Sequence, residues 1–313
     1  MLVLLAPAAA RAQQSELGFS IAAEGFPSYF RYDATPGQEL RGAVVLRSES
    51  ASTEHVLLRA ADVTTAGSGG LDYGSGRPGS VGTWIDLERR RVALAPGATI
   101  TVPFTLRVPG DAGPGDHLAG IVALNRADVR RAERRSSDEA FDLRFLPRLA
   151  IATWVTVPGP RDPALAVGNV AFDVTPSGSA VSVLVRDTGN TLIRHTGGRL
   201  RLLQGERVLT DQRVKLDAFV PNTEIRYRVP LRGTPARGEY RLVGTLRPEG
   251  AAPVAVDEVL RFGSEAQEEL REETGQEAKG AIPAWMWILL AFLAAVGAAF
   301  GVGYVRARRA LKR

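Results

Sequence analysis

Residues 282–305 form an almost unbroken apolar run, IPAWMWILLAFLAAVGAAFGVGYV, which contains no charged residue. At about 1.5 Å per residue, a helix of this length crosses a hydrocarbon core of about 30 Å. Trp285 and Trp287 near its start and Tyr304 near its end are placed like interfacial aromatic anchors. The sequence therefore predicts one C-terminal transmembrane helix.

The basic residues after this run set the direction of the helix. The tail 306–313 holds no acid and five basic residues: Arg306, Arg308, Arg309, Lys312 and Arg313. The net charge of the whole chain is also +5, so the part before the tail is neutral. Because basic flanks stay cytoplasmic, we expect a single-pass protein of the cell membrane, with extracellular N-terminal domains and a cytoplasmic C-terminus. A neutral ectodomain also predicts no nucleic-acid partner.

A GxxxG pattern lies inside the predicted membrane helix. Gly297 and Gly301 would permit close approach of a second helix, and therefore self-association. Small residues are also common in membrane helices for no such reason, so both interpretations stay open.

Residues 1–12, MLVLLAPAAARA, combine a short apolar run with an A-x-A cleavage pattern. The basic n-region of a signal peptide is missing from this start. We expect a truncated signal peptide that is cleaved after Ala12.

Between the two ends, apolar residues alternate with polar ones, as in half-buried strands. In the clearest case, 99–108, one face is formed by Ile100, Val102, Phe104, Leu106 and Val108. Pro-Gly pairs near the ends of such stretches are typical of turns. The series predicts a β-sandwich over residues 17–157, in which Pro103 indicates a strand edge or an outward-facing nitrogen.

A second alternating series follows a proline-rich linker at 158–163 and fills residues 164–263. It contains seven stretches of strand character: 165–170, 181–185, 199–203, 207–214, 225–231, 240–246 and 256–262. This number of short strands is typical of an immunoglobulin-like sandwich. Residues 187–190, DTGN, predict a tight turn in which Gly and Asn can take positive φ. Residues 264–281 are charged throughout and predict a stalk, helical or disordered. The predicted fold is all-β: two tandem immunoglobulin-like β-sandwich domains followed by a single C-terminal transmembrane helix.

Two polar excursions interrupt the first domain. Residues 64–83 are rich in Gly and Ser and predict a flexible loop, after which Trp84 begins another strand. Residues 126–139 predict either a mobile hairpin tip or a short surface helix. Tyr73 and Trp84 are the candidate ligand-binding residues, because aromatic residues beside polar loops commonly stack on ligands such as sugars. A core position in its strand explains Trp84 equally well.

The sequence offers no catalytic motif. Cysteine is absent, which removes zinc-finger, iron–sulfur and thiol-nucleophile sites. The three histidines have no metal-ligand spacing. Asp111 and Asp116 flank Pro114 and Gly115, so turn formation explains them better than a pair of catalytic carboxylates. We predict a protein that is not an enzyme, with no cofactor and no metal site.

An ordered series of motifs resembles the peptidoglycan-binding extracellular domain of WxL-interacting proteins. It extends over residues 17–157 and comprises YFRY at 29–32, PGQ at 36–38, a strand that ends at Leu46, AAD at 60–62, DY at 72–73, GTWI at 82–85, VALAPG at 92–97, VP at 108–109, PGDH at 114–117 and GI at 120–121. The second domain holds the place of that family's second module, with DTGN at 187–190 and the shared layout of signal, two β-domains, helix and basic tail.

The resemblance implies non-catalytic attachment to the cell wall and to surface partners. The first domain would bind peptidoglycan or another cell-wall glycan, and the second would bind a surface protein of the WxL type or similar. The second domain is short and lacks obvious partner-binding motifs, so host binding does not carry over. The alternative is a membrane-tethered chaperone or assembly subunit of a surface protein complex, without affinity for the wall.

Overall fold

The computed structural model describes residues 17–135, 146–175 and 178–263. Several predicted segments lie outside these ranges: the signal peptide 1–12, the stalk 264–281, the membrane helix 282–305 and the tail 306–313. The candidate residues of the helix and tail lie outside them as well: Trp285, Trp287, Gly297, Gly301, Tyr304, Arg306, Arg308 and Arg309. Within the described ranges, no helix has the length and apolar character needed to cross a membrane.

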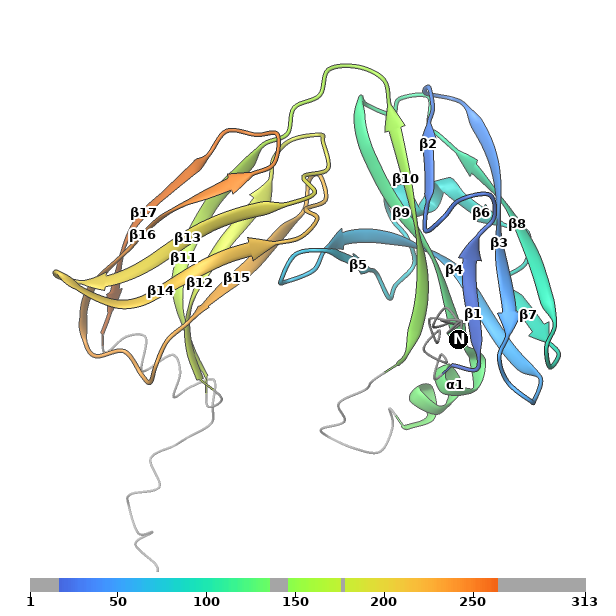
Figure 1. The fold of residues 1–313 in the computed structure, drawn as a ribbon, viewed down its shortest axis with the longest axis horizontal. Helices are drawn as coiled ribbons and strands as arrows, with labels where there is room; N and C mark the ends of the chain where they lie inside the picture. The colour runs from blue at the N-terminus through green and yellow to red at the C-terminus, as the bar shows by residue number, and fades with distance from the viewer. Residues whose placement is uncertain (1–16, 136–145, 176–177, 264–313) are drawn as a thin grey trace, which may run out of the picture. The chain divides into compact units, whose positions relative to one another are not determined.

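The first sandwich consists of two sheets (Figure 1). One sheet has the order β1 (Phe19–Ala23), β3 (Glu39–Ser48), β8 (Thr99–Arg107) and β6 (Ile85–Leu87). The other has the order β2 (Phe30–Asp33), β10 (Arg148–Val157), β9 (Gly115–Asn125), β4 (Glu54–Thr65) and β5 (Leu71–Tyr73), and β7 (Arg91–Leu94) also pairs with β4. Between β1 and β2 the chain crosses from one sheet to the other, and β2 pairs with β10 in parallel.

The alternation in β8 places its apolar face in the core between the sheets. Val102, Phe104 and Leu106 are buried there, and the ring of Phe30 from the other sheet meets Phe104 edge-to-face at 4.9 Å. The Pro103 carbonyl accepts the N–H of Glu88, just after β6 ends, so the backbone nitrogen of Pro103 also faces β6 and points away from β3. Proline is tolerated at this position because it costs no hydrogen bond to β3. The strand predicted from this pattern is therefore confirmed.

The second sandwich has a three-stranded and a four-stranded sheet. The first has the order β11 (Leu165–Thr175), β12 (Gly178–Asp187) and β15 (Glu224–Pro230). The second has the order β14 (Arg207–Leu216), β13 (Thr196–Gln204), β16 (Gly238–Pro248) and β17 (Val254–Phe262). The rings of Phe172 and Tyr240 meet across the two sheets at 5.1 Å. The prediction of an all-β chain with two sandwiches is confirmed for the described residues.

Three local predictions need correction or completion. Trp84 does not begin a strand; it ends a 3₁₀ turn, Val81–Trp84, and β6 starts one residue later. Residues 126–135 form the helix α1 (Arg126–Arg135), which decides between the two interpretations of that segment. The DTGN turn was expected to use positive φ at Gly189 and Asn190, but neither residue has it.

Both sandwiches belong to one compact unit, which includes every described residue up to Pro235 and Glu239–Arg261. The segments that carry the contacts between the sandwiches are the linker after β10, the 187–192 turn and the loop before β15. These segments hold the candidate site.

Candidate functional site

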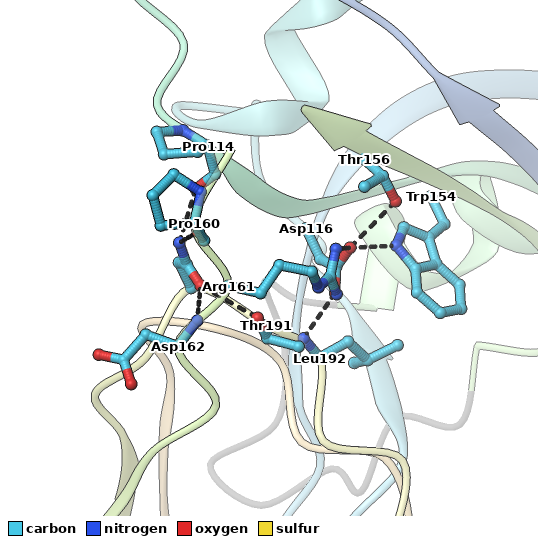
Figure 2. A network of polar contacts seen from close by, with 10 residues as sticks. Pro114, Asp116, Trp154, Thr156, Pro160, Arg161, Asp162, Thr191 and Leu192 are labelled. Carbon is cyan, nitrogen blue, oxygen red and sulfur yellow. Dashed lines mark hydrogen bonds and ion pairs between the residues drawn. The ribbon is translucent and has the colours of Figure 1, made fainter. Parts of the chain in front are cut away.

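The carboxylate of Asp116, at the start of β9, is the centre of a polar network that joins the two sandwiches (Figure 2). Its Oδ1 accepts hydrogen bonds from Trp154 Nε1 at 2.9 Å and from Thr156 Oγ1 at 3.0 Å. Its Oδ2 accepts the backbone N–H of Leu192, in the second sandwich, at 2.8 Å. Arg161 of the linker donates to both oxygens, at 3.1 and 2.5 Å. We call these five residues the junction network.

Burial and charge act in opposite directions on Asp116. Its side chain is fully buried, and desolvation alone would raise the pKa. The hydrogen bonds from Arg161, Trp154 and Leu192, with the positive charge of Arg161, outweigh this effect and lower the pKa below its usual value. Asp116 therefore remains ionised, and its oxygens are occupied by donors. The sequence assigned this residue only to a turn, and that assignment is wrong because its main partners lie far along the chain.

A second set of bonds surrounds Asn190. Its Nδ2 donates to the carbonyls of Pro114 and Pro160, at 3.0 and 2.9 Å, and its Oδ1 accepts the N–H of Asp162 at 2.7 Å. Gly189 is required beside it, because a Cβ at this position would lie 2.0 Å from the Asp162 carbonyl oxygen. The glycine of the DTGN motif is thus explained by close approach of the linker rather than by positive φ.

The hairpin of β4 and β5 makes another contact with the second sandwich. Thr65 Oγ1 lies 2.6 Å from Thr223 Oγ1 and accepts the N–H of Val220 at 2.8 Å. Val220 also packs with Val63 and Leu118 in a buried apolar cluster. The Gly-rich segment takes part, since Gly70 N–H donates to the Ala218 carbonyl at 2.9 Å. Polar and apolar contacts therefore both hold the two sandwiches together.

Three side chains fix the Gly-rich loop to the first sandwich, contrary to the expected flexibility. Asp62 accepts the backbone N–H groups of Gly79, Ser80 and Gly82 at 2.7 to 3.2 Å. Arg59 donates to the carbonyls of Gly74 and Ser75. Arg148 donates to the Tyr73 carbonyl at 2.6 Å and to Asp72 Oδ1 at 2.8 Å.

Replacing Asp62 with alanine should open the second half of this loop. The change removes one acceptor shared by three amides, so amide exchange at residues 79–82 should become at least about tenfold faster, which corresponds to about 1.4 kcal/mol. Hydrogen exchange measured by mass spectrometry on residues 74–84 tests this. Asp72→Ala, which removes only an exposed ion pair, is the control and should leave these amides unchanged. Equal exchange in wild-type protein and Asp62→Ala would contradict the role given to Asp62.

The two predicted ligand-binding aromatics, Tyr73 at the end of β5 and Trp84 just after the Gly-rich loop, have packing roles. Tyr73 covers Gly120 of β9, where a Cβ would lie 2.3 Å from its ring, and burial raises the pKa of its hydroxyl. Trp84 is half-buried against the main core and lies 4.9 Å from the His117 ring. Neither ring lines the cavities beside Trp154, beside His117 or beside Arg59. Their role in ligand binding stays a prediction.

An aromatic pair that the sequence reasoning missed lies beside the junction network. The rings of Tyr29 and Trp154 are stacked, with centroids 6.3 Å apart and an interplanar angle of 22°. The guanidinium of Arg31 lies 4.7 Å from the Trp154 ring centroid, in cation–π geometry. All three line a cleft of about 430 Å³. Trp154 alternates with Val155 and Val157, which are buried, so the period of two could have indicated that its ring faces outward.

The outer edge of β10 is only partly covered. β2 pairs with residues 153–156, and among the described residues no strand pairs with 148–152 on that side. Ala34 N–H donates to the Thr156 carbonyl, which shows that Thr156 points its backbone groups to this edge. Because strand residues alternate, Arg148, Ala150 and Ala152 point their N–H and C=O groups to the same edge.

In the described part of the chain, no group of three or more His, Asp or Glu side chains could hold a metal ion.

No family model and no curated protein matches this sequence. Among solved structures, similarity is found to a complex described as the chaperone–tip adhesin complex of CFA/I fimbriae biogenesis, with 11% identity, 77% of this chain and 98% of that chain covered, and a TM-score of 0.34. The E. coli chaperone DraB matches with 10% identity, 77% and 98% coverage and a TM-score of 0.33. A family 123 glycoside hydrolase from Clostridium perfringens matches with 11% identity, 46% and 27% coverage and a TM-score of 0.31. With TM-scores this low, none of these proteins defines what this chain binds.

Proposed function

We propose that this chain is a non-catalytic binding protein that holds a partner protein by adding one of the partner's strands to the open edge of β10. The observation that carries the proposal is that no described strand pairs with 148–152 on the side of β2. Arg148, Ala150 and Ala152 point their backbone donors and acceptors to this edge, just before the start of the pairing with β2. An exposed edge of this kind is a template for an extended peptide, which gains main-chain hydrogen bonds there.

The side chains of this stretch favour it over the edges of the second sandwich. Leu149 and Ile151 face the core, and Ala150 and Ala152 carry small, uncharged and half-buried side chains. The four edge strands of the second sandwich, β11, β14, β15 and β17, instead carry charges that are paired with arginines, among them Asp173, Asp211, Glu224 and Asp257. Charged edges resist strand addition. The partner site therefore lies on the first sandwich, whereas the sequence placed it on the second.

In this proposal, the helix predicted at 282–305 tethers both sandwiches to the cell membrane, and the tail 306–313 is cytoplasmic. The apolar run and its basic flank support this placement. The function is that of a membrane-tethered chaperone or assembly subunit for a surface protein.

A photo-reactive residue at position 150, in cells that express the full chain, tests strand addition. We expect one cross-linked protein, and we expect the cross-link from a reporter at position 152 to disappear in Ala150→Pro. Proline removes the N–H that faces the open edge and leaves the ladder with β9 intact. Ala150→Ser keeps this N–H and is the control. A reporter at Glu258 on the edge of β17 should capture nothing. Cross-linking that is unaffected by Ala150→Pro would exclude the proposed edge.

Glycan binding by the first sandwich is the second candidate, as the resemblance to WxL-interacting proteins implies. Tyr29 favours it, because 40% of this large aromatic residue is exposed while it stacks on Trp154 beside a cleft. Aromatic faces bind the apolar faces of sugars. Wild-type protein should then co-sediment with purified peptidoglycan, and Tyr29→Ala should not. Val259→Ala, at another exposed apolar side chain, is the control. If folded wild-type protein stays in the supernatant, wall binding is excluded.

A further inference from the structure

Another cavity lies in the first sandwich, between the Gly-rich loop and the turn at 88–90. Its volume is about 410 Å³. Three arginines line it, Arg59 from β4, Arg77 from the Gly-rich loop and Arg90 from the turn before β7, together with backbone and small side chains of the loop. The lining includes no acidic residue and no aromatic ring. Cationic groups therefore dominate the chemistry of this cavity.

The loop structure fixes the position of these arginines. Arg59 donates through both terminal nitrogens to the carbonyls of Gly74 and Ser75. The Arg90 carbonyl accepts the N–H of Leu58 at 2.9 Å, which holds the turn beside Arg59. Asp62 fixes the other side of the loop through Gly79, next to Pro78 and Arg77. Three guanidinium-bearing segments that are distant in sequence thus meet at one cavity.

Carboxylates do not neutralise these charges. Among the described residues, Arg59, Arg77 and Arg90 form no ion pair, in contrast to the many arginines of this chain that do. The nearby Asp62 is occupied by three backbone amides, and Asp72 by Arg148. The Nε–H of Arg59 is buried and has no hydrogen-bond partner in the described part of the chain. Burial, and secondarily the charge of Arg148, lower the pKa of Arg59, so its cationic form lacks compensation.

We propose that this cavity binds a phosphate ester. A guanidinium group offers parallel N–H donors that match the oxygens of a phosphate, and charge-assisted bonds of this type are among the strongest hydrogen bonds in proteins. Three arginines offer more hydrogen-bond donors than the two oxygens of one carboxylate can use. They suit a tetrahedral oxyanion, whose oxygens accept hydrogen bonds from several directions. The volume leaves room for the group to which the phosphate is esterified. The site is independent of the edge of β10, so it adds a ligand to the proposed function.

Calorimetric titration of the full chain in detergent tests this site with three probes. They are inorganic phosphate, sn-glycerol 3-phosphate and the short-chain lipid dihexanoyl phosphatidylglycerol. We expect one saturable site for the ester. A preference for glycerol 3-phosphate would identify a soluble or polymer-borne ester as the source, and a preference for the lipid would identify a headgroup.

The double variant Arg77→Gln/Arg90→Gln should weaken binding by at least about tenfold, since it removes two charge-assisted contacts. Both side chains are exposed and unpaired among the described residues, so the fold should be retained. Arg89→Gln/Arg91→Gln is the matched control, because it removes the same charge from the two neighbours of Arg90, which do not line the cavity. Equal weakening in both variants would show a diffuse electrostatic effect and overturn the proposal. The absence of binding for all three probes up to roughly 10 mM would also overturn it.

Discussion

Asp116→Ala should lower the free energy of unfolding by about 3 kcal/mol. The substitution leaves Arg161 without its counter-ion and leaves donors of Trp154, Thr156 and Leu192 without an acceptor in a buried place. Removing one partner of a buried pair costs more than the pair contributes, because the remaining groups lose their solvation as well. Urea denaturation of residues 17–263, followed by tryptophan fluorescence, measures the loss.

The control for this prediction is Asp111→Ala. Asp111 and Asp116 lie on either side of the same Pro-Gly turn, but Asp111 is exposed. Its replacement should change the free energy of unfolding by less than about 0.5 kcal/mol. Similar losses for both variants would mean that the turn, and not the junction network, depends on these acids.

The stability of the protein should fall as pH rises from about 4 to about 7 because of Asp187. Burial is the main reason that the pKa of this carboxyl group is raised to about 7, and the negative charge of Asp162 raises it further. The hydrogen bond from the Gly189 N–H lowers the pKa but does not outweigh these two effects. The folded state then keeps a proton that the unfolded state has already lost. Each pH unit in this window removes about 1.4 kcal/mol, in total of the order of 4 kcal/mol, and above pH 7 the loss is constant.

Asp187→Asn separates this effect from other titrations. The amide oxygen still accepts the Gly189 N–H, which donates to Asp187 Oδ1 at 2.9 Å in the wild-type protein, but no charge develops. Denaturation of both proteins is measured between pH 4 and pH 8.5. The free energy of unfolding of the variant should exceed that of the wild-type protein by an amount that grows up to about pH 7. If the two stabilities run parallel over this range, Asp187 does not hold its proton in the folded state.

The strands were predictable because their signal is local. A half-buried strand places every second residue in the core, so the pattern of Ile100, Val102 and Phe104 identifies β8 without knowledge of its neighbours. The same reasoning found all seven strands of the second sandwich, although the structure extends most of them by several residues. Alternation says which face is buried, and it says less about where a strand ends.

The candidate site was not predictable in this way. Arg161 and Leu192 lie 45 and 76 residues after Asp116 in the chain, and only the folded linker and turn bring them to one carboxylate. The Gly-rich loop reads as flexible because its composition is that of a linker. Side chains of β4 and β10 fix it in place, and composition does not encode such contacts.

The sequence by itself determined the period of two, the absence of thiols and the location of the whole net positive charge in the last residues. These properties are sums or repeats over neighbouring residues. The tertiary structure decided which side chains share an environment: the donors around Asp116, the uncovered stretch of β10 beside the short β2, and the three arginines around one cavity. Desolvation and charge depend on distance in space, so only the packed chain shows why the pKa of Asp116 is lowered, why the pKa of Asp187 is raised and that Arg59 lacks a counter-ion.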